Sequence, residues 1–287
     1  MERREFLKAA ALSAATLALP KGLQAAVAKA NGRKPNLIFI LSDDVGLGDV
    51  GCFGADNYKT PRIDALAESG IRFDQCYSTP VCGPSRSQIL TGRYPFRTGM
   101  ISNASGGVLR PTNEIMIPKV LKPAGYVTAS VGKWSQLPLQ PGNWGFDEYL
   151  CFVGSGKYWS EQDPSYTLNG KETELPEGKY LPDVMHEFLV DFITRHRDQP
   201  FYVHYAMSHI HSPIVRTPDS TATSDHYADN IAYMDKLVGK LMDDLERLKL
   251  RQNTLVIFVG DNGTMPGYEE RSTVRGRRLS GRKGTIL

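Results

Sequence analysis

The sequence contains few cysteines, and their spacing excludes several common uses of this residue. Only Cys52, Cys76, Cys82 and Cys151 occur among the 287 residues. No two of them form a CxxC pair, which argues against a zinc or redox site of that type. They are also too few for a disulfide scaffold in a chain of this length. A single bridge between Cys52 and Cys76 stays open as an alternative.

The sequence also lacks a strong excess of charge of one sign. It has 34 Lys and Arg against 31 Asp and Glu, a formal net charge of +3. Basic residues gather near the N-terminus and between Arg271 and Lys283, but neither group is interleaved with aromatic side chains that could stack on bases. We therefore expect no nucleic-acid partner. A basic patch beside a pocket would suit an anionic small substrate.

No apolar run is long enough for a stable membrane anchor. The stretch Ala9–Leu19 falls short of the roughly 20 residues that span a bilayer. It follows Arg3-Arg4 and precedes the small-residue cleavage site Ala26-Val27-Ala28. An ordinary amphipathic helix is the alternative, but the stretch has no polar face. We expect residues 1–30 to be a twin-arginine signal peptide, with the twin-arginine translocase as partner and a periplasmic or extracellular location.

Apolar runs alternate with amphipathic segments after residue 34. The strands predicted from short apolar runs are Pro35–Leu41, Tyr126–Val131, Phe201–Met207 and Thr254–Val259. The predicted helices cover residues 60–69, 84–90, 117–122, 181–197 and 225–249. This alternation predicts an α/β fold, a doubly wound, mostly parallel sheet flanked by helices. Residues 137–181, rich in Gly, Pro and aromatics, are predicted to form long active-site loops.

Acidic side chains follow two of the predicted strands. Asp43 and Asp44 come after the first strand, and Asp261 and Asn262 after the last. Ligands bind at the carboxyl ends of the strands in such sheets. Hard oxygen ligands from two strand ends could converge on Ca²⁺ or Mg²⁺. Taken singly, each pair is also what a helix cap or a turn would contain.

The segment Cys82-Gly83-Pro84-Ser85-Arg86, continuing to Pro95, resembles the signature of the formylglycine-dependent (type I) sulfatases of the alkaline-phosphatase-like superfamily. The family's second signature is similar to Gly125–Thr128 followed by Gly132-Lys133-Trp134. The Asp43-Asp44, Asp261–Gly263 and Gly281–Thr285 elements match the family in the same order. The resemblance covers nearly everything after the leader and implies a sulfatase catalytic domain over residues 31–287.

The resemblance implies that a formylglycine-generating maturation enzyme oxidises Cys82 to an aldehyde, which hydrates to a diol. One hydroxyl would attack sulfur, and the second would lose its proton and expel sulfate. A serine could not complete the second step, because it has no second hydroxyl. Asp43, Asp44, Asp261 and Asn262 match the family's ligands for Ca²⁺, with Mg²⁺ possible, and the modified Cys82 completes that set. The metal would favour the alkoxide and offset the charge of sulfate.

The resemblance also assigns roles to basic residues. Arg86 matches the arginine that holds the diol, and Lys133 and Lys283 match lysines that contact formylglycine and sulfate. His211 matches the histidine that contacts sulfate and can protonate the leaving alcohol, with His209 as the competing assignment. His204, within a predicted strand, is expected to be structural.

Two departures from the family stand out. Ser135 follows Gly132-Lys133-Trp134 where most sulfatases carry a histidine, and a serine is a poor base at neutral pH; His209 is a candidate to substitute for it. The chain ends at Leu287, where the family continues, so the small C-terminal subdomain is expected to be absent and the domain incomplete.

The expected function is hydrolysis of sulfate esters, on a sulfated small molecule or glycan. A phosphate or phosphonate ester hydrolase and a non-catalytic sulfoglycan-binding protein are the alternatives. The sulfoglycan-binding alternative is suggested by Ser135 and by the shortened C-terminus.

Overall fold

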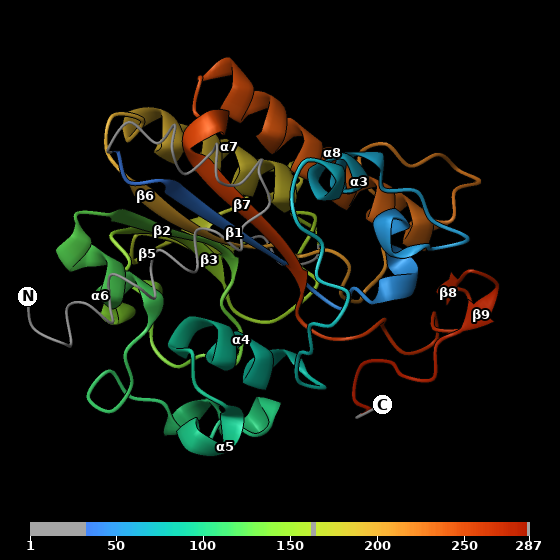
Figure 1. Ribbon diagram of the computed structural model, residues 1–287, viewed down its shortest axis with the longest axis horizontal. Helices are drawn as coiled ribbons and strands as arrows, with labels where there is room; N and C mark the ends of the chain where they lie inside the picture. Colours follow the sequence, from blue (N-terminus) through green and yellow to red (C-terminus); the bar gives the residue numbers. More distant parts are fainter. Residues whose placement is uncertain (1–32, 162–164, 286–287) are drawn as a thin grey trace, which may run out of the picture.

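The computed structural model describes residues 33–161 and 165–285, and the predicted leader lies outside these ranges. A seven-stranded sheet runs through the centre in the order β5-β4-β3-β2-β6-β1-β7 (Figure 1). Its strands are β1 (Asn36–Ser42), β2 (Val127–Lys133), β3 (Glu148–Phe152), β4 (Ser165–Leu168), β5 (Lys171–Glu174), β6 (Phe201–Ala206) and β7 (Thr254–Gly260). The short strands β8 (Thr273–Val274) and β9 (Arg277–Arg278) form a separate pair.

The five neighbouring strands β3, β2, β6, β1 and β7 are parallel to one another. Strands β4 and β5 extend the sheet beyond β3 and are antiparallel. All four predicted strands are present within one or two residues of their expected bounds. In β1, Ile38 and Ile40 face one core, and Leu37 and Phe39 pack against the other. This alternation is the two-residue period of a strand that is covered on both faces.

Helices cover both faces of the sheet (Figure 1). Helices α3 (Pro61–Glu68), α7 (Leu181–Arg195) and α8 (His226–Arg247) lie on one side. Helices α4 (Cys82–Thr91), α5 (Pro95–Thr98) and α6 (Ile117–Leu121) lie on the other. Short 3-10 turns lie between the strands and helices: η1 (Leu47–Asp49), η2 (Gly51–Phe53), η3 (Asn103–Val108), η4 (Lys122–Ala124), η5 (Pro141–Trp144) and η6 (Arg251–Asn253). The predicted α/β fold with a mostly parallel sheet is thus confirmed. Among the described helices, none combines the length and the apolarity needed to cross a bilayer.

The prediction that residues 137–181 form only long loops is wrong. This stretch contains β3, which pairs parallel with β2, and the hairpin of β4 and β5. Asn169 and Gly170 connect the hairpin with φ values of 47° and 89°, the left-handed backbone that an Asn-Gly two-residue turn requires. The Asn-Gly pair between two short polar strands was the missed signal. The cysteines Cys52 and Cys76 are both free thiols.

Candidate active site

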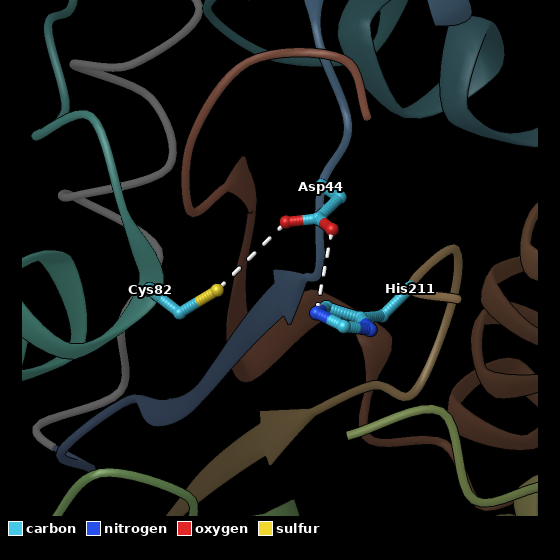
Figure 2. A group of neighbouring side chains, drawn as sticks. All are labelled: Asp44, Cys82 and His211. Atoms are coloured by element: carbon cyan, nitrogen blue, oxygen red, sulfur yellow. Dashed lines mark hydrogen bonds and ion pairs between the residues drawn. The ribbon is translucent and has the colours of Figure 1, made fainter. Parts of the chain in front are cut away.

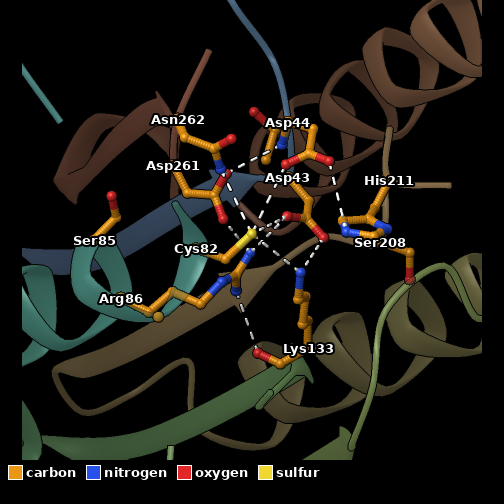
Figure 3. Close-up of polar contacts among 12 residues, drawn as sticks. Asp43, Asp44, Cys82, Ser85, Arg86, Lys133, Ser208, His211, Asp261 and Asn262 are labelled. Atoms are coloured by element: carbon orange, nitrogen blue, oxygen red, sulfur yellow. Dashed lines mark hydrogen bonds and ion pairs between the residues drawn. The ribbon is translucent and has the colours of Figure 1, made fainter. Parts of the chain in front are cut away.

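The residues singled out from the sequence meet at the carboxyl ends of β1, β2, β6 and β7 (Figure 3). Asp43 and Asp44 follow β1, Lys133 ends β2, and Asp261 and Asn262 follow β7. Parallel strands bring their carboxyl ends to a single edge of the sheet, which is why positions far apart in sequence converge there. All five side chains are at most 3% exposed.

Cys82 enters the site from the first residue of α4. Its Sγ lies 3.4 Å from Asp43 Oδ1 and 3.8 Å from Asp44 Oδ1, and the residue is 1% exposed. Lys133 Nζ and Asn262 Nδ2 are each 3.6 Å from the same sulfur. Burial and the nearby carboxylates of Asp261 and Asp43 raise the pKa of the thiol to about 12.

The signature residues around Cys82 hold it in place. Ser85 Oγ lies 2.6 Å from Thr79 Oγ1 and accepts a hydrogen bond from Thr79 N at 3.1 Å, which fixes the segment before the helix. Gly83 N donates to Asn103 Oδ1 at 2.9 Å. A Cβ at Gly83 would lie 2.7 Å from Met100 Cε, so the glycine allows a close approach that a larger residue would obstruct.

Two buried cations neutralise the carboxylates at the floor of the site. Arg86 Nη2 lies 2.8 Å from Asp261 Oδ2 and 3.4 Å from Asp43 Oδ1. Lys133 Nζ lies 2.5 Å from Asp43 Oδ2. Burial alone would raise the pKa of Asp43, but Lys133 and Arg86 outweigh it and hold that pKa below its usual range. Burial and the repulsion from Asp43 raise the pKa of Asp261 instead.

His211 and Lys283 form the more open wall of the site. Lys283 Nζ lies 2.7 Å from Asp44 Oδ2 and 3.0 Å from His211 Nε2. His211 Nε2 is 3.6 Å from Asp44 Oδ2 (Figure 2). The side chains of His211 and Lys283 are 18% and 17% exposed, whereas Asp44 is fully buried. A ligand can therefore reach the carboxylates from the side of these two residues.

Of the competing histidines, only His211 points into the site. His209 is fully buried, its Nε2 lies 3.0 Å from Tyr180 OH, and its ring packs against Tyr158 and Tyr233. Burial lowers the pKa of His209 to about 3. The suggestion that His209 substitutes for the missing family histidine is therefore wrong, because its ring is enclosed among tyrosines. The backbone of His209 still contributes, since its carbonyl accepts a hydrogen bond from Asp43 N at 2.6 Å.

His204 lies within β6, as expected, with 1% exposure, and its ring stacks on Phe39. Burial, with a smaller effect of Arg86, lowers its pKa to about 3. Ser135 is 2% exposed, and its Oγ has no hydrogen-bond partner within residues 33–161 and 165–285. The hydroxyl therefore takes no part in a proton-transfer pair with another described side chain.

Two residues at the site carried no prediction from the sequence. Tyr158 OH donates to the carbonyl oxygens of Ser208 and His211, each at 2.9 Å, and so holds the loop that carries His211. No local sequence signal marks Tyr158. Asp49 is fully buried behind the loops that carry the candidate ligands. The two glycines that precede it in Gly46-Leu47-Gly48-Asp49 were a usable signal.

The donor set fits a hard divalent cation. Ligand atoms of Asp43, Asp44, Cys82 and Asp261 all lie within 4.8 Å of one another. Asn262 Oδ1 is buried and has no hydrogen-bond partner in the part of the chain that the structure describes. Three clustered carboxylates with an orphaned amide oxygen provide the oxygen-rich environment that Ca²⁺ and Mg²⁺ prefer.

The mostly parallel sheet with helices on both faces has the α/β fold of the alkaline-phosphatase-like class of proteins. A Vibrio parahaemolyticus protein of the alkaline phosphatase superfamily shares the fold with a TM-score of 0.54 at 20% identity, over 82% of this chain and 56% of that chain. Within this class the chain belongs to the sulfatase family, whose profile matches residues 35–284.

Individual relatives agree with this assignment. The chain is 31% identical to N-acetylgalactosamine-6-sulfatase of Homo sapiens, over 88% of this chain and 54% of that protein. The crystal structure of Ps i-CgsB, also solved in complex with k-i-k-neocarrahexaose, superposes with a TM-score of 0.73 at 28% identity, over 88% of this chain and 63% of that chain. The chain spans about half the length of the curated relatives it matches.

Proposed function

We propose that this protein hydrolyses sulfate esters, with a nucleophile produced from Cys82 and with a bound divalent cation. The observation that carries the proposal is the placement of Cys82 Sγ, 3.4 Å from Asp43 and 3.6 Å from both Lys133 and Asn262. The residue that the family oxidises is thus surrounded by the residues that would bind a metal ion and a sulfate group. Membership of the sulfatase family supports the same reaction.

The formylglycine and the divalent cation would each supply one kind of chemistry. A formylglycine at position 82, once hydrated, would supply one hydroxyl to attack sulfur and a second to release sulfate. A cation held by Asp43, Asp44, Asp261 and Asn262 would supply positive charge beside that residue and beside the sulfate oxygens. Ca²⁺ is the ion proposed, with Mg²⁺ as the alternative, since both prefer oxygen ligands.

The remaining residues of the site neutralise negative charge and transfer a proton. Arg86 and Lys133 keep Asp43 and Asp261 compensated inside the buried floor. Lys283 and His211 lie on the open side, where an incoming sulfate ester would meet them. Fixed cations in a dry site stabilise developing negative charge by about 3 kcal/mol each. In its protonated form, His211 would give the proton on Nε2 to the departing alcohol, because Nδ1 already donates to the carbonyl oxygen of Ser212.

The proposed substrate is a sulfated carbohydrate. Two relatives support this proposal. One is named N-acetylgalactosamine-6-sulfatase, and the other was solved in complex with k-i-k-neocarrahexaose. Parallel assays with an aryl sulfate and an aryl phosphate test the reaction class. We expect a strong preference for the sulfate. A preference for the phosphate would instead support a phosphate or phosphonate ester hydrolase.

Mass spectrometry of the peptide that contains residue 82 tests the nucleophile. In protein made by its native host, the peptide should carry formylglycine produced by a maturation enzyme. An unmodified cysteine there would favour a sulfoglycan-binding protein without catalysis. Treatment with EDTA should abolish hydrolysis, and added Ca²⁺ should restore it; activity that survives complete chelation would argue against the metal.

We also propose that residues 1–30 direct export through the twin-arginine translocase to the periplasm or beyond. The Arg3-Arg4 pair and the following apolar stretch support this location. Replacement of both arginines by lysine should retain the protein in the cytoplasm. Export of the double variant at the normal level would contradict the proposal.

A further inference from the structure

Asp49 is a fully buried carboxylate behind the candidate metal site. Four donors surround it. Gly46 N and Thr264 Oγ1 donate to Oδ2 at 2.8 and 2.7 Å. Ser272 Oγ and Tyr227 OH donate to Oδ1 at 2.5 and 3.2 Å. Each carboxylate oxygen thus accepts two hydrogen bonds, which fills the capacity of an ionised carboxylate.

Two of these donors belong to the loops that carry the candidate ligands. Gly46 lies two residues after Asp44, and Thr264 lies two residues after Asn262. A single oxygen of Asp49 therefore connects the loop after β1 to the loop after β7. The loops meet elsewhere too, because Asp44 N donates to Asp261 Oδ1 at 3.1 Å.

The glycines beside Asp49 permit this contact. A Cβ at Gly46 would lie 2.4 Å from Thr264 Oγ1, and a Cβ at Gly48 would lie 2.1 Å from Ser272 O. Either methyl group would push the segment of residues 264–272 away from the loop after β1. The short distance between the two loops thus depends on small residues and on a carboxylate that bridges them.

The bridge extends to the open wall of the site. Thr264 O accepts a hydrogen bond from Lys283 N at 3.0 Å. The side chain of Lys283 in turn contacts Asp44 and His211. Thr264 therefore contacts Asp49 through its hydroxyl and the backbone of Lys283 through its carbonyl.

We infer that Asp49 is a positioning residue that fixes the spacing of the two ligand-bearing loops and thereby sets the affinity of the site for its divalent cation. This inference rests on the metal site of the proposed function. Asp49 does not touch Cys82 in the described contacts, so its effect is indirect. Partners that orient ligands without binding the metal alter metal affinity by about 10–100-fold when they are replaced.

The test compares Ca²⁺ binding by calorimetry in the purified chain and in three variants. Asp49→Asn keeps the shape but replaces one acceptor with an amide donor, and Thr264→Val removes one donor while leaving the charge of Asp49 in place. Asp235→Asn is the matched control, because Asp235 is a buried carboxylate, 4% exposed, that accepts hydrogen bonds from Arg62 N and Ile63 N between α3 and α8.

We expect Asp49→Asn and Thr264→Val to raise the Kd for Ca²⁺ by about 10-fold or more. Asp235→Asn should leave the Kd unchanged even where it lowers the Tm by the same amount. Wild-type affinity in both site variants would overturn the inference. Weaker binding in Asp49→Asn alone would also overturn it, because the effect would then come from the lost charge and not from the bridge.

Amide hydrogen exchange separates this inference from the metal site itself. In Asp49→Asn, the amides of Asp44 and Lys283 should exchange faster, with or without Ca²⁺, because the bridge that orders both loops is weakened. A wild-type chain that binds no divalent cation would contradict the metal site of the proposed function. In that case unchanged exchange in Asp49→Asn would overturn the bridging role, and faster exchange at both amides would support it.

Discussion

The two ends of the central parallel strands are both polar and buried, yet they are built differently. At the amino ends, Asn36 Nδ2 donates to Thr254 Oγ1 at 3.2 Å and Asn36 Oδ1 accepts from Phe201 N at 3.4 Å. These groups are neutral. At the carboxyl ends, the charged side chains of Asp43, Arg86, Lys133 and Asp261 are at most 1% exposed.

The difference shows where function is located in this sheet. A neutral hydrogen bond between strands contributes about 1 kcal/mol to stability. The desolvation of a buried charge costs several kcal/mol, and only close partners of opposite charge offset this free energy. Asp43 has such partners in Arg86 and Lys133. A cluster with this cost at one end of the sheet only is typical of a binding or catalytic site.

The largest effect is expected at Cys82. Cys82→Ala should lower kcat/KM for an aryl sulfate by a factor of about 10³ or more, because it removes the precursor of the nucleophile. Thermal unfolding should change little by comparison, since Ala fits the first turn of α4. Cys151→Ala, a second buried cysteine in β3, is the control and should keep its activity.

Lys133→Met should have the next largest effect. Loss of a buried cation beside the reacting group is expected to lower kcat about 10²–10³-fold. It also leaves Asp43 with Arg86 as its remaining close cation, so the Tm should fall as well. Kinetics and calorimetry on the same preparation separate the two effects. A fall in Tm with kcat intact would make Lys133 a structural residue only.

The stability of the protein should fall at low pH because the buried His204 of β6 stays neutral in the folded state. His204 has a folded pKa of about 3, against about 6.5 in the unfolded chain. Below pH 6.5 the unfolded chain binds a proton that the folded chain excludes, so stability falls as the pH drops from 6.5 toward 3. Between pH 7 and pH 5 the loss at this residue is about 2 kcal/mol.

Urea unfolding of the wild type and of His204→Phe at the two pH values measures this loss. The variant should lose less stability than the wild type over the same interval. His209, with a pKa also lowered to about 3, should contribute a loss of its own in both proteins. Equal losses in the wild type and the variant would show that His204 is not the group that titrates.

The smallest effect is expected at the amino ends of the strands. Asn36→Ala removes hydrogen bonds to Thr254 and Phe201 and should cost about 1–2 kcal/mol of stability. The kcat/KM value should stay at the wild-type level, because the change lies at the opposite end of the strands from Cys82. A large loss of activity in a folded Asn36→Ala protein would show that the two ends are coupled.

Four strands of the sheet, the main helices and the charged residues of the site were predictable because their signals are local, whereas β3 was missed. Apolar runs define β1, β2, β6 and β7, and the signature around Cys82 is contiguous. The hairpin of β4 and β5 was missed because its strands are short and polar, with only the Asn-Gly turn as a signal. The choice between His209 and His211 depended on which side chain faces the core.

By itself, the sequence determined the family signature and the order of its elements along the chain, since both depend on neighbouring residues. Only the tertiary structure decided which side chains meet. Lys283 reaches Asp44 across 239 positions of sequence, and Asp49 reaches Thr264 across 215. The tertiary structure also encloses His209 among tyrosines and leaves Ser135 Oγ without a hydrogen-bond partner among the described residues. Contacts of this kind follow from strand order in the sheet, which no local pattern specifies.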